Sequence, residues 1–169
     1  MNIRVSQEKD FKEIYSFVKT AFETARVSDG TEQDFVLKLR AGETYLPELE
    51  FVAQENGILV GHIMLTKQAY RTTEGTRTGV LVAPLAVALP YRNRGIGGKL
   101  LRHACEQAVK AGYTAAFLVG NPQYYGRFGF RKTSEYGIKN SSDIPDDVVL
   151  GSELVAGALQ GIRGEINII

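Results

Sequence analysis

Apolar residues recur with helical spacing in three segments of the chain. The segment from Gln7 to about Ala25 predicts an amphipathic helix with Ser6 as its N-cap; its apolar positions are Phe11, Ile14, Val18 and Phe22. A second helix is predicted from Thr31 to Arg40. A third is predicted from Ile96 to Ala111, with an apolar side formed by Leu100, Leu101, Ala104 and Ala108. It should end at Gly112, where a left-handed cap residue is expected.

Other apolar segments have the length and composition of strands. Asn56-Gly57 is typical of a two-residue hairpin, which predicts strands at Phe51–Glu55 and from Ile58 to about Tyr70. The polar segment Thr72–Thr78 predicts a second hairpin loop, and a largely buried strand should follow at Val80–Leu89. Further strands are predicted at Asn2–Val5, Thr114–Val119, Phe130–Thr133, Val148–Leu154 and Ile162–Ile168, with a short helix or turn from Asn121-Pro122.

The order of these segments is β-α-α-β-β-β-α-β-α-β-β. Such an order predicts an α/β (α+β) fold with a single mixed, mostly antiparallel, twisted sheet of about seven strands and helices on both faces. The sequence contains no repeat and no Pro/Gly/Ser-rich linker. We therefore expect one domain.

The composition narrows the classes of function. The chain has 169 residues, with 20 Lys and Arg against 19 Asp and Glu, and a net charge of +1 argues against nucleic-acid or membrane partners. One cysteine, Cys105, excludes an internal disulfide framework and multi-cysteine metal sites. The N-terminal residues lack the apolar stretch of a signal peptide, and no apolar run reaches a membrane-spanning length. These features predict a soluble, cytoplasmic protein.

Charge is unevenly distributed along the sequence. Nine of the 20 basic residues lie between Gly75 and Ser134, where Glu106 is the single acidic residue, so the rest of the chain is acidic. A basic segment of this kind favours an anionic ligand.

The clearest chemical signal is Pro90–Lys99, which places three glycines between a predicted strand and a predicted helix. Glycine lets backbone N–H groups approach a ligand closely, and a helix N-terminus favours anions, so this turn should bind phosphates. Asn93 and Leu100 stand where a P-loop requires Gly and Ser or Thr. These residues exclude a P-loop, and a dinucleotide-binding turn fits poorly because Leu100 replaces its third glycine.

Two motifs carry a resemblance to a known family. Arg92-x-x-Gly95-x-Gly97, preceded by Leu85-Ala86-Val87 and Pro90, resembles the acetyl-CoA signature of the GNAT N-acetyltransferase superfamily. Asn121-Pro122-Gln123-Tyr124-Tyr125-Gly126-Arg127-Phe128-Gly129-Phe130 resembles the GNAT segment in which a Tyr precedes a Gly-Phe pair. The combination is most similar to a bacterial branch of acetyltransferases whose acceptors are undefined.

The resemblance implies one acyl-CoA N-acyltransferase (GNAT) domain over residues 1–169, with acetyl-CoA as acyl donor and no metal. The central parallel strands around Leu85 and Phe117 should splay apart to admit the pantetheine arm. The residues implied to bind the coenzyme are Leu85, Ala86, Val87, Arg92, Asn93, Arg94, Gly95, Ile96, Gly97, Gly98 and Asn121.

The resemblance also implies the reaction, in which a primary amine attacks the acetyl carbon directly in a ternary complex. Tyr125 stands at the position of the family's general acid, and its alternative interpretation is a packing aromatic. A non-catalytic acyl-CoA-binding or regulatory domain is the alternative function, because no acidic residue lies between Gly79 and Pro90, where many relatives have one.

The acceptor and the base are less defined by the sequence. The general base is His62, a water molecule or none. The acceptor is a small-molecule or a peptide or protein amine, with contacts expected from Arg26–Thr31 and Glu135–Ile144. The oligomeric state is a monomer or a homodimer.

Overall fold

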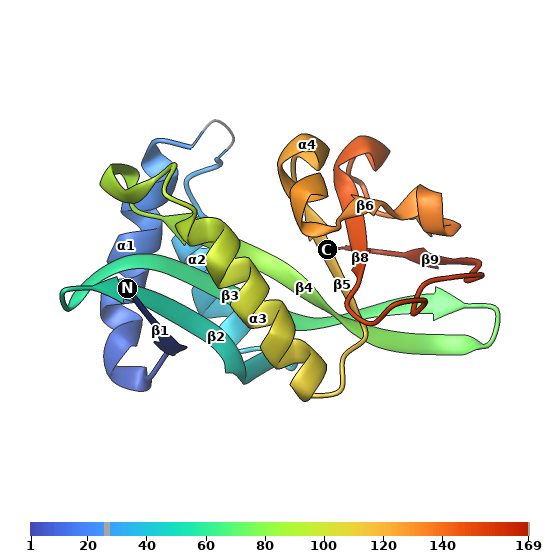
Figure 1. Ribbon diagram of the computed structural model, residues 1–169, viewed down its shortest axis with the longest axis horizontal. Helices are drawn as coiled ribbons and strands as arrows, with labels where there is room; N and C mark the ends of the chain where they lie inside the picture. The colour runs from blue at the N-terminus through green and yellow to red at the C-terminus, as the bar shows by residue number, and fades with distance from the viewer. Residues whose placement is uncertain (26–27, 169) are drawn as a thin grey trace. The chain divides into compact units, whose positions relative to one another are not determined.

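The computed structural model describes residues 1–25 and 28–168. Its strands form one sheet in the order β1-β2-β3-β4-β5-β8-β6, with β9 paired to both β3 and β7 (Figure 1). The strands are β1 (Asn2–Val5), β2 (Tyr45–Glu55), β3 (Ile58–Thr72), β4 (Gly75–Val87), β5 (Ala115–Val119), β6 (Arg131–Lys132), β7 (Ile138–Asn140), β8 (Val149–Glu153) and β9 (Gly164–Ile166). The pairs β4–β5 and β7–β9 are parallel. The mixed, mostly antiparallel sheet that the sequence predicts is confirmed.

Four α-helices and several 3₁₀ turns connect these strands within the described residues. The helices are α1 (Phe11–Glu23), α2 (Glu32–Arg40), α3 (Ile96–Lys110) and α4 (Pro122–Tyr125). Gly112 has a φ of 99°, so the left-handed residue expected after α3 is present. The chain divides into two compact units, residues 1–66 with 83–104 and residues 67–82 with 105–169.

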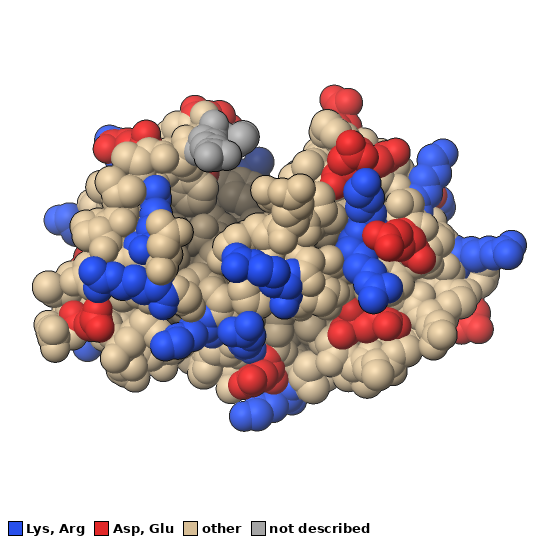
Figure 2. Space-filling model, turned by 45° about the horizontal axis from the view of Figure 1, so that its top comes forward, with Lys and Arg blue, Asp and Glu red and all other residues tan. Residues whose placement is uncertain are grey.

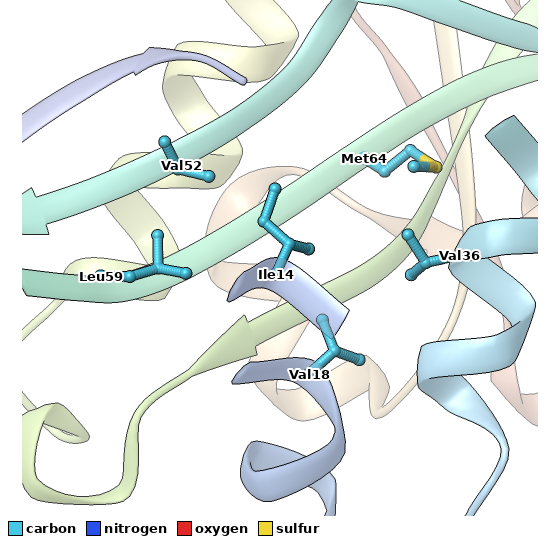
Figure 3. Packing of buried hydrophobic residues seen from close by; sticks show 6 residues of the cluster. All are labelled: Ile14, Val18, Val36, Val52, Leu59 and Met64. Carbon is cyan, nitrogen blue, oxygen red and sulfur yellow. The ribbon is translucent and has the colours of Figure 1, made fainter. Parts of the chain in front are cut away.

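In the first unit, α1 and α2 cover one face of β2 and β3. Ile14 and Val18 of α1 and Val36 of α2 pack with Val52, Leu59 and Met64 of the two strands, and all six side chains are buried (Figure 3). The spacing of Ile14 and Val18 places both on one side of α1, which is why this helix is amphipathic.

The first turns of α3 lie on the other face of the same strands. Gly61 of β3 lies against Leu100 and Ile96, and its missing side chain leaves the room that Leu100 occupies. The Phe51 and His103 rings pack edge to face, with centroids 4.9 Å apart. This unit therefore has helices on both faces of the sheet, as the sequence predicts.

In the second unit, β5 bonds to β4 on one side and to β8 on the other. Phe117 in the middle of β5 is fully buried, and its ring centroid lies 5.1 Å from that of Tyr70. β9 pairs with Tyr70–Thr72 of β3 and with β7. These pairings secure the C-terminal part of the described chain to the sheet.

Some local expectations are wrong. Ser6 is not a helix cap, because its backbone N–H donates to Glu50 O at 2.8 Å and extends the β1–β2 pairing. The cap is formed instead at Gln7, whose N–H donates to Asp10 Oδ2 at 2.8 Å. The second hairpin loop is shorter than Thr72–Thr78, since β4 already begins at Gly75. The sheet has nine strands over the described residues rather than about seven.

Candidate functional site

The segment after β4 turns sharply into α3. Leu89–Tyr91 form a 3₁₀ turn, and Asn93 and Gly95 then adopt left-handed φ values of 64° and 78°. These conformations let α3 begin at Ile96, and Lys99 N donates to Gly95 O at 3.0 Å. The N–H groups of the first helical turn have no carbonyl partners within the helix, so the turn offers several donors and a positive dipole end to an anion.

The Arg92 side chain forms hydrogen bonds beside this turn, within the first unit. Its Nε donates to Val87 O at 3.1 Å, and its Nη2 donates to Ala21 O at 2.6 Å. Val87 is the last residue of β4, and Ala21 lies in the last turn of α1. The side chain that the sequence assigns to coenzyme binding therefore bonds to two backbone carbonyls, and its contact with a coenzyme stays a prediction.

The other coenzyme-binding residues predicted near the turn lie in the same unit. Leu85, Ala86 and Val87 form the end of β4, where Ala86 is buried and its two neighbours are half-buried. The Arg94 guanidinium lies 5.2 Å from the centroid of the Tyr91 ring. Ile96, Gly97 and Gly98 form the buried start of α3, whereas Asn93, Arg94 and Gly95 are exposed. The structure brings these residues together, and their binding roles stay predictions.

In the second unit, the ladder between β4 and β5 is short. Parallel pairing joins Val80 to Ala116 and Leu81 to Phe117. β5 continues for two further residues, Leu118 and Val119, which pair with β8 on its other side. Within the described residues of this unit, the ladder between β4 and β5 ends at Leu81 and Phe117, and the splay of the strands around Leu85 and Phe117 stays a prediction.

The second motif begins directly after β5. The Asn121 side chain caps α4, because its Oδ1 accepts a hydrogen bond from Gln123 N at 2.8 Å. Tyr125 N donates to Asn121 O at 3.0 Å, and Tyr125 O accepts from Phe130 N at 3.2 Å. Asn121 is therefore a structural cap of α4, and its predicted contact with the coenzyme is untested.

The Tyr125 ring lies among aromatic side chains. Its centroid is 4.8 Å from that of Tyr124 and 6.1 Å from that of Phe130, both at steep angles. A Cβ added to Gly120 would lie 2.5 Å from Tyr125 Cε2, so the ring occupies space that only glycine leaves open. Burial raises the pKa of the Tyr125 phenol to about 12, and Tyr124 adds to the rise. The phenol is therefore protonated at neutral pH, and its role as a proton donor stays a prediction.

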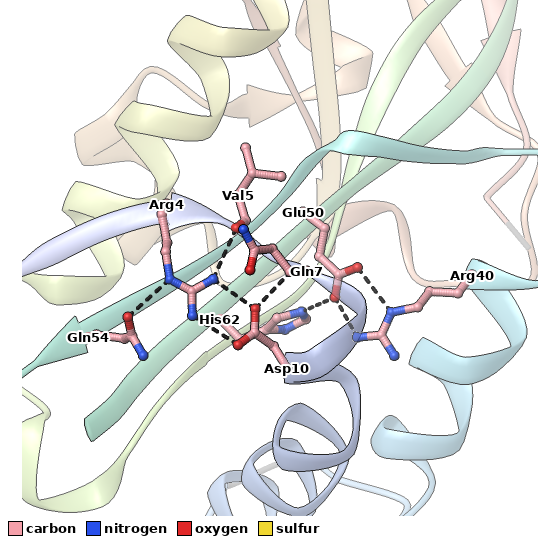
Figure 4. Close-up of polar contacts among 8 residues, drawn as sticks. All are labelled: Arg4, Val5, Gln7, Asp10, Arg40, Glu50, Gln54 and His62. Carbon is pink, nitrogen blue, oxygen red and sulfur yellow. Dashed lines mark hydrogen bonds and ion pairs between the residues drawn. The ribbon is translucent and has the colours of Figure 1, made fainter. Parts of the chain in front are cut away.

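His62 belongs to a buried polar cluster that the sequence analysis did not identify. The Glu50 carboxylate accepts hydrogen bonds from Arg40 Nε at 3.0 Å, Arg40 Nη2 at 2.6 Å, Tyr45 Oη at 2.7 Å and His62 Nε2 at 2.8 Å (Figure 4 shows the Arg40 and His62 contacts). His62 and Glu50 are both fully buried. Among the residues that the structure describes, none is a hydrogen-bond partner of His62 Nδ1.

Charge–charge contacts set the ionisation of Glu50. Burial alone would raise the pKa of the carboxyl, but hydrogen bonds from His62 and Arg40 reverse this effect and hold the pKa at about 2. A carboxylate can only accept hydrogen bonds, so the Nε2 atom of His62 carries the proton of its bond to Glu50. Glu50 was not predicted as a buried residue. Leu49 beside it is also buried, so the strand lacks the alternation of buried and exposed side chains that marks an inward-facing position.

The segments expected to contact the acceptor are described only in part. Arg26 and Val27 lie outside the described residues. In the rest of that turn, Asp29 Oδ1 accepts hydrogen bonds from Thr31 N at 2.9 Å and Thr31 Oγ1 at 2.6 Å. The segment Glu135–Ile144 contains β7, which the sequence analysis did not predict.

The surface carries charges of both signs. On the face shown in Figure 2, Lys and Arg side chains are interspersed with Asp and Glu side chains. Over the described residues, no group of three or more His, Cys, Asp or Glu side chains is arranged to hold a metal ion. No helix in that part of the chain is long and apolar enough to cross a membrane.

Comparison with known sequences identifies related proteins. The family described as the acetyltransferase (GNAT) domain matches residues 2–133. The chain is 33% identical to the uncharacterised N-acetyltransferase YjhQ of Escherichia coli K12 over 108 residues, which is 64% of this chain and 60% of YjhQ. It is 26% identical to the uncharacterised N-acetyltransferase YhbS of the same strain over 168 residues, covering 99% of this chain and 95% of YhbS.

Comparison with solved structures gives the same fold. The crystal structure of YhbS from Escherichia coli in complex with CoA has a TM-score of 0.85 at 24% identity, covering 99% of this chain and 89% of that one. A GNAT family acetyltransferase from Brucella melitensis in complex with acetyl-CoA has a TM-score of 0.77 at 25% identity, covering 99% and 95%.

Proposed function

This chain belongs to the GNAT acetyltransferase family, and we propose that it moves the acetyl group of acetyl-CoA to a primary amine by direct attack in a ternary complex. The observation that carries the proposal is the turn in which left-handed Asn93 and Gly95 lead into the N-terminus of α3. Such a turn favours the diphosphate of a coenzyme. In this proposal residues 1–169 act as one catalytic domain.

The coenzyme is held mainly by backbone groups. The N–H groups of Asn93 to Gly98 bind the diphosphate, and Arg94 adds a positive charge on the exposed side of the turn. The backbone of Leu85 and Val87 pairs with the amides of pantetheine, and one N–H near them polarises the thioester carbonyl. Ala86, Arg92 and Asn121 complete the predicted set, with Asn121 fixing the start of α4 through its cap.

The chemical step forms one bond and breaks one. The neutral amine nitrogen attacks the acetyl carbonyl carbon, the new C–N bond forms, and the C–S bond breaks as electrons return to sulfur. The nitrogen loses one proton to solvent water as the amide forms, and the CoA thiolate gains one. Tyr125 supplies the proton to sulfur, since its phenol is protonated at neutral pH, and solvent water returns a proton to the phenolate.

The proton of the acceptor ammonium goes to solvent water in this proposal. His62 is the side chain whose type suits a base, but it is fully buried and its Nε2 bonds to Glu50 at 2.8 Å. A base must come within hydrogen-bond reach of the proton that it removes. Deprotonation of the amine in water before it binds meets this requirement without His62.

Exchange of Tyr125 for phenylalanine tests the proton donor. Tyr125→Phe should lower kcat by about 100-fold or more, the scale of a lost general acid, and should leave acetyl-CoA affinity unchanged. The neighbouring Tyr124→Phe is the matched control, since it removes the same hydroxyl from the adjacent residue and should keep kcat. Release of free CoA thiol measures turnover, and calorimetry measures affinity. Equal turnover in the Tyr125 variant and the control contradicts the assignment.

The acceptor class follows from charge. Eighteen of the 19 acidic residues lie outside the basic segment Gly75–Ser134, and the segments expected to contact the acceptor lie outside it too. A cationic amine, on a small molecule or on a peptide, fits this distribution. A mass-spectrometric screen of acetyl-CoA with pooled amines, peptides and aminated antibiotics should give acetylated cationic products. Only neutral or anionic products would contradict the acceptor class, and CoA binding without thiol release would favour a non-catalytic acyl-CoA-binding domain.

A further inference from the structure

The Arg92 side chain joins two parts of the first unit that are distant in sequence. Its Nε bonds to Val87 O at 3.1 Å, and its Nη2 bonds to Ala21 O at 2.6 Å, across 71 positions of the chain. Both acceptors are backbone carbonyls, and the one guanidinium donates a hydrogen bond to each of them. The planar fork of arginine suits this arrangement, and the single ammonium of lysine does not.

Each carbonyl needs a donor for a local reason. α1 ends at Glu23, so Ala21 O is one of the last four carbonyls of the helix, which lack helical N–H partners; it accepts hydrogen bonds from Arg92 Nη2 at 2.6 Å and from Thr24 Oγ1 at 3.3 Å. A cation near a helix C-terminus is also favoured by the helix dipole. Val87 is the last residue of β4, where the chain leaves the sheet and begins the coenzyme turn. Arg92 therefore bonds to the end of each element.

We propose that Arg92 is a positioning residue that couples the coenzyme turn to the C-terminal turn of α1. The guanidinium acts on the coenzyme through the position of the turn and not as a phosphate ligand. When CoA fixes residues 93–98, Arg92 carries that restriction to α1, from which the chain proceeds toward the segment expected to contact the acceptor. This inference rests on the proposed function, since it assigns residues 93–98 to the coenzyme.

Two substitutions separate positioning from phosphate contact. Arg92→Lys keeps the charge but loses the fork, and Arg92→Met loses both while keeping an unbranched side chain of similar reach. If Arg92 is a positioning residue, both variants should bind CoA about tenfold more weakly than the unchanged protein. The reason is that both lose the paired charge-assisted hydrogen bonds to the two carbonyls. A phosphate ligand should give a graded result, with Arg92→Lys close to the unchanged protein. Calorimetry with CoA alone measures both.

Hydrogen exchange tests the coupling itself. In the unchanged chain, CoA should slow amide exchange in a peptide over residues 18–25 as well as in one over residues 93–98. In Arg92→Lys, CoA at saturating concentration should still protect residues 93–98, and protection of residues 18–25 should be lost. Retained protection of residues 18–25 in this variant, or a graded loss of affinity, overturns the inference.

The controls distinguish this inference from the proposed function. If CoA does not protect residues 93–98 in the unchanged chain, the proposed coenzyme site is wrong. The role of Arg92 fails separately, when residues 93–98 are protected but protection of residues 18–25 does not depend on Arg92. If Arg92→Met melts below the assay temperature, Arg92→Lys alone is used for the exchange measurement. If Arg92→Lys melts, Arg92→Met is used in its place. Lys99→Arg, an exchange at an exposed position of α3, should keep the protection of residues 18–25.

Discussion

At the scale of single residues, the position of the Tyr125 ring depends on an absent side chain. Gly120 follows β5, and a Cβ there would lie 2.5 Å from Cε2 and 2.9 Å from Cδ2 of Tyr125. These distances are far below an ordinary carbon–carbon contact of about 3.5–4.0 Å, so the ring would have to move. Gly120, which directly precedes Asn121 in the sequence, thus helps to define where the phenol lies.

Gly120→Ala should therefore lower kcat by about tenfold or more, because a displaced phenol donates its proton poorly. Gly126→Ala is the matched control: Gly126 has helical dihedral angles, and a Cβ there would meet nothing within 4 Å. This variant should keep kcat. Steady-state turnover of both variants with one identified amine gives the comparison, and unchanged turnover in Gly120→Ala would show that the ring position is not needed.

The residues that the sequence predicted best are those held by local geometry. The sharp turn between β4 and α3 was predictable because glycines separate the two elements in the sequence, and Asn93 and Gly95 have left-handed φ values; coenzyme binding by this turn stays a prediction. Glu50 and the Arg92 bridge were not predictable. Glu50 meets Arg40 and His62 only after the sheet and α2 have assembled, and Arg92 meets Ala21 across 71 positions.

At the scale of elements, α1 depends on two buried contacts with the sheet. Ile14 and Val18 are fully buried in the cluster shown in Figure 3, whereas Ile58, at the start of β3, is 57% exposed. The same type of side chain is therefore buried at position 14 and exposed at position 58. The stability contributed by the α1 contact can be measured by making the same substitution at both.

Ile14→Ala should reduce the free energy of unfolding by about 2–5 kcal/mol, since it removes buried methyl groups and leaves a cavity. Ile58→Ala should cost less than about 1 kcal/mol, because it removes surface that already faces water. Urea denaturation followed by circular dichroism measures both values. Equal losses for the two variants would mean that α1 does not stabilise the sheet through Ile14.

The elements themselves were predictable where one short signal determines them. Asn56 and Gly57 have φ values of 52° and 76°, as a tight hairpin turn requires, and β2 and β3 flank them as expected. β7 was missed because its three residues form a strand only through pairing with β9. The early part of β2 was missed because its pairing with β3 shifts between Tyr45 and Glu50, which disturbs the alternating pattern.

At the scale of the whole molecule, two buried carboxylates link stability to pH. Hydrogen bonds from Arg4 hold the pKa of Asp10 below its ordinary value, and the pKa of Glu50 lies at about 2. An unfolded chain binds protons at these groups more readily than the folded protein does. The stabilisation is therefore complete above the unfolded pKa of Glu50, about 4.5, and is lost as the pH falls to about 2.

Glu50→Gln should remove most of this acid dependence. It should also cost about 3–5 kcal/mol near neutral pH, because it leaves the buried Arg40 charge without its partner. Glu48→Gln is the matched control, since Glu48 lies on the same strand and is exposed. Urea unfolding at a series of pH values from neutral to 3 measures both effects. An unchanged slope in the Glu50 variant would mean that another group causes the acid loss.

The pairing of β9 with β3 has a consequence in time. Gly164–Ile166 pair with Tyr70–Thr72, and roughly ninety residues are synthesised between the two strands. At about 5–20 residues per second, β3 leaves the ribosome about 5–20 seconds before its partner exists. During that interval the backbone groups that later bond to β9 are open to other chains or to chaperones. A complete chain refolding from denaturant meets no such delay, so the aggregation yield during synthesis should exceed that during refolding.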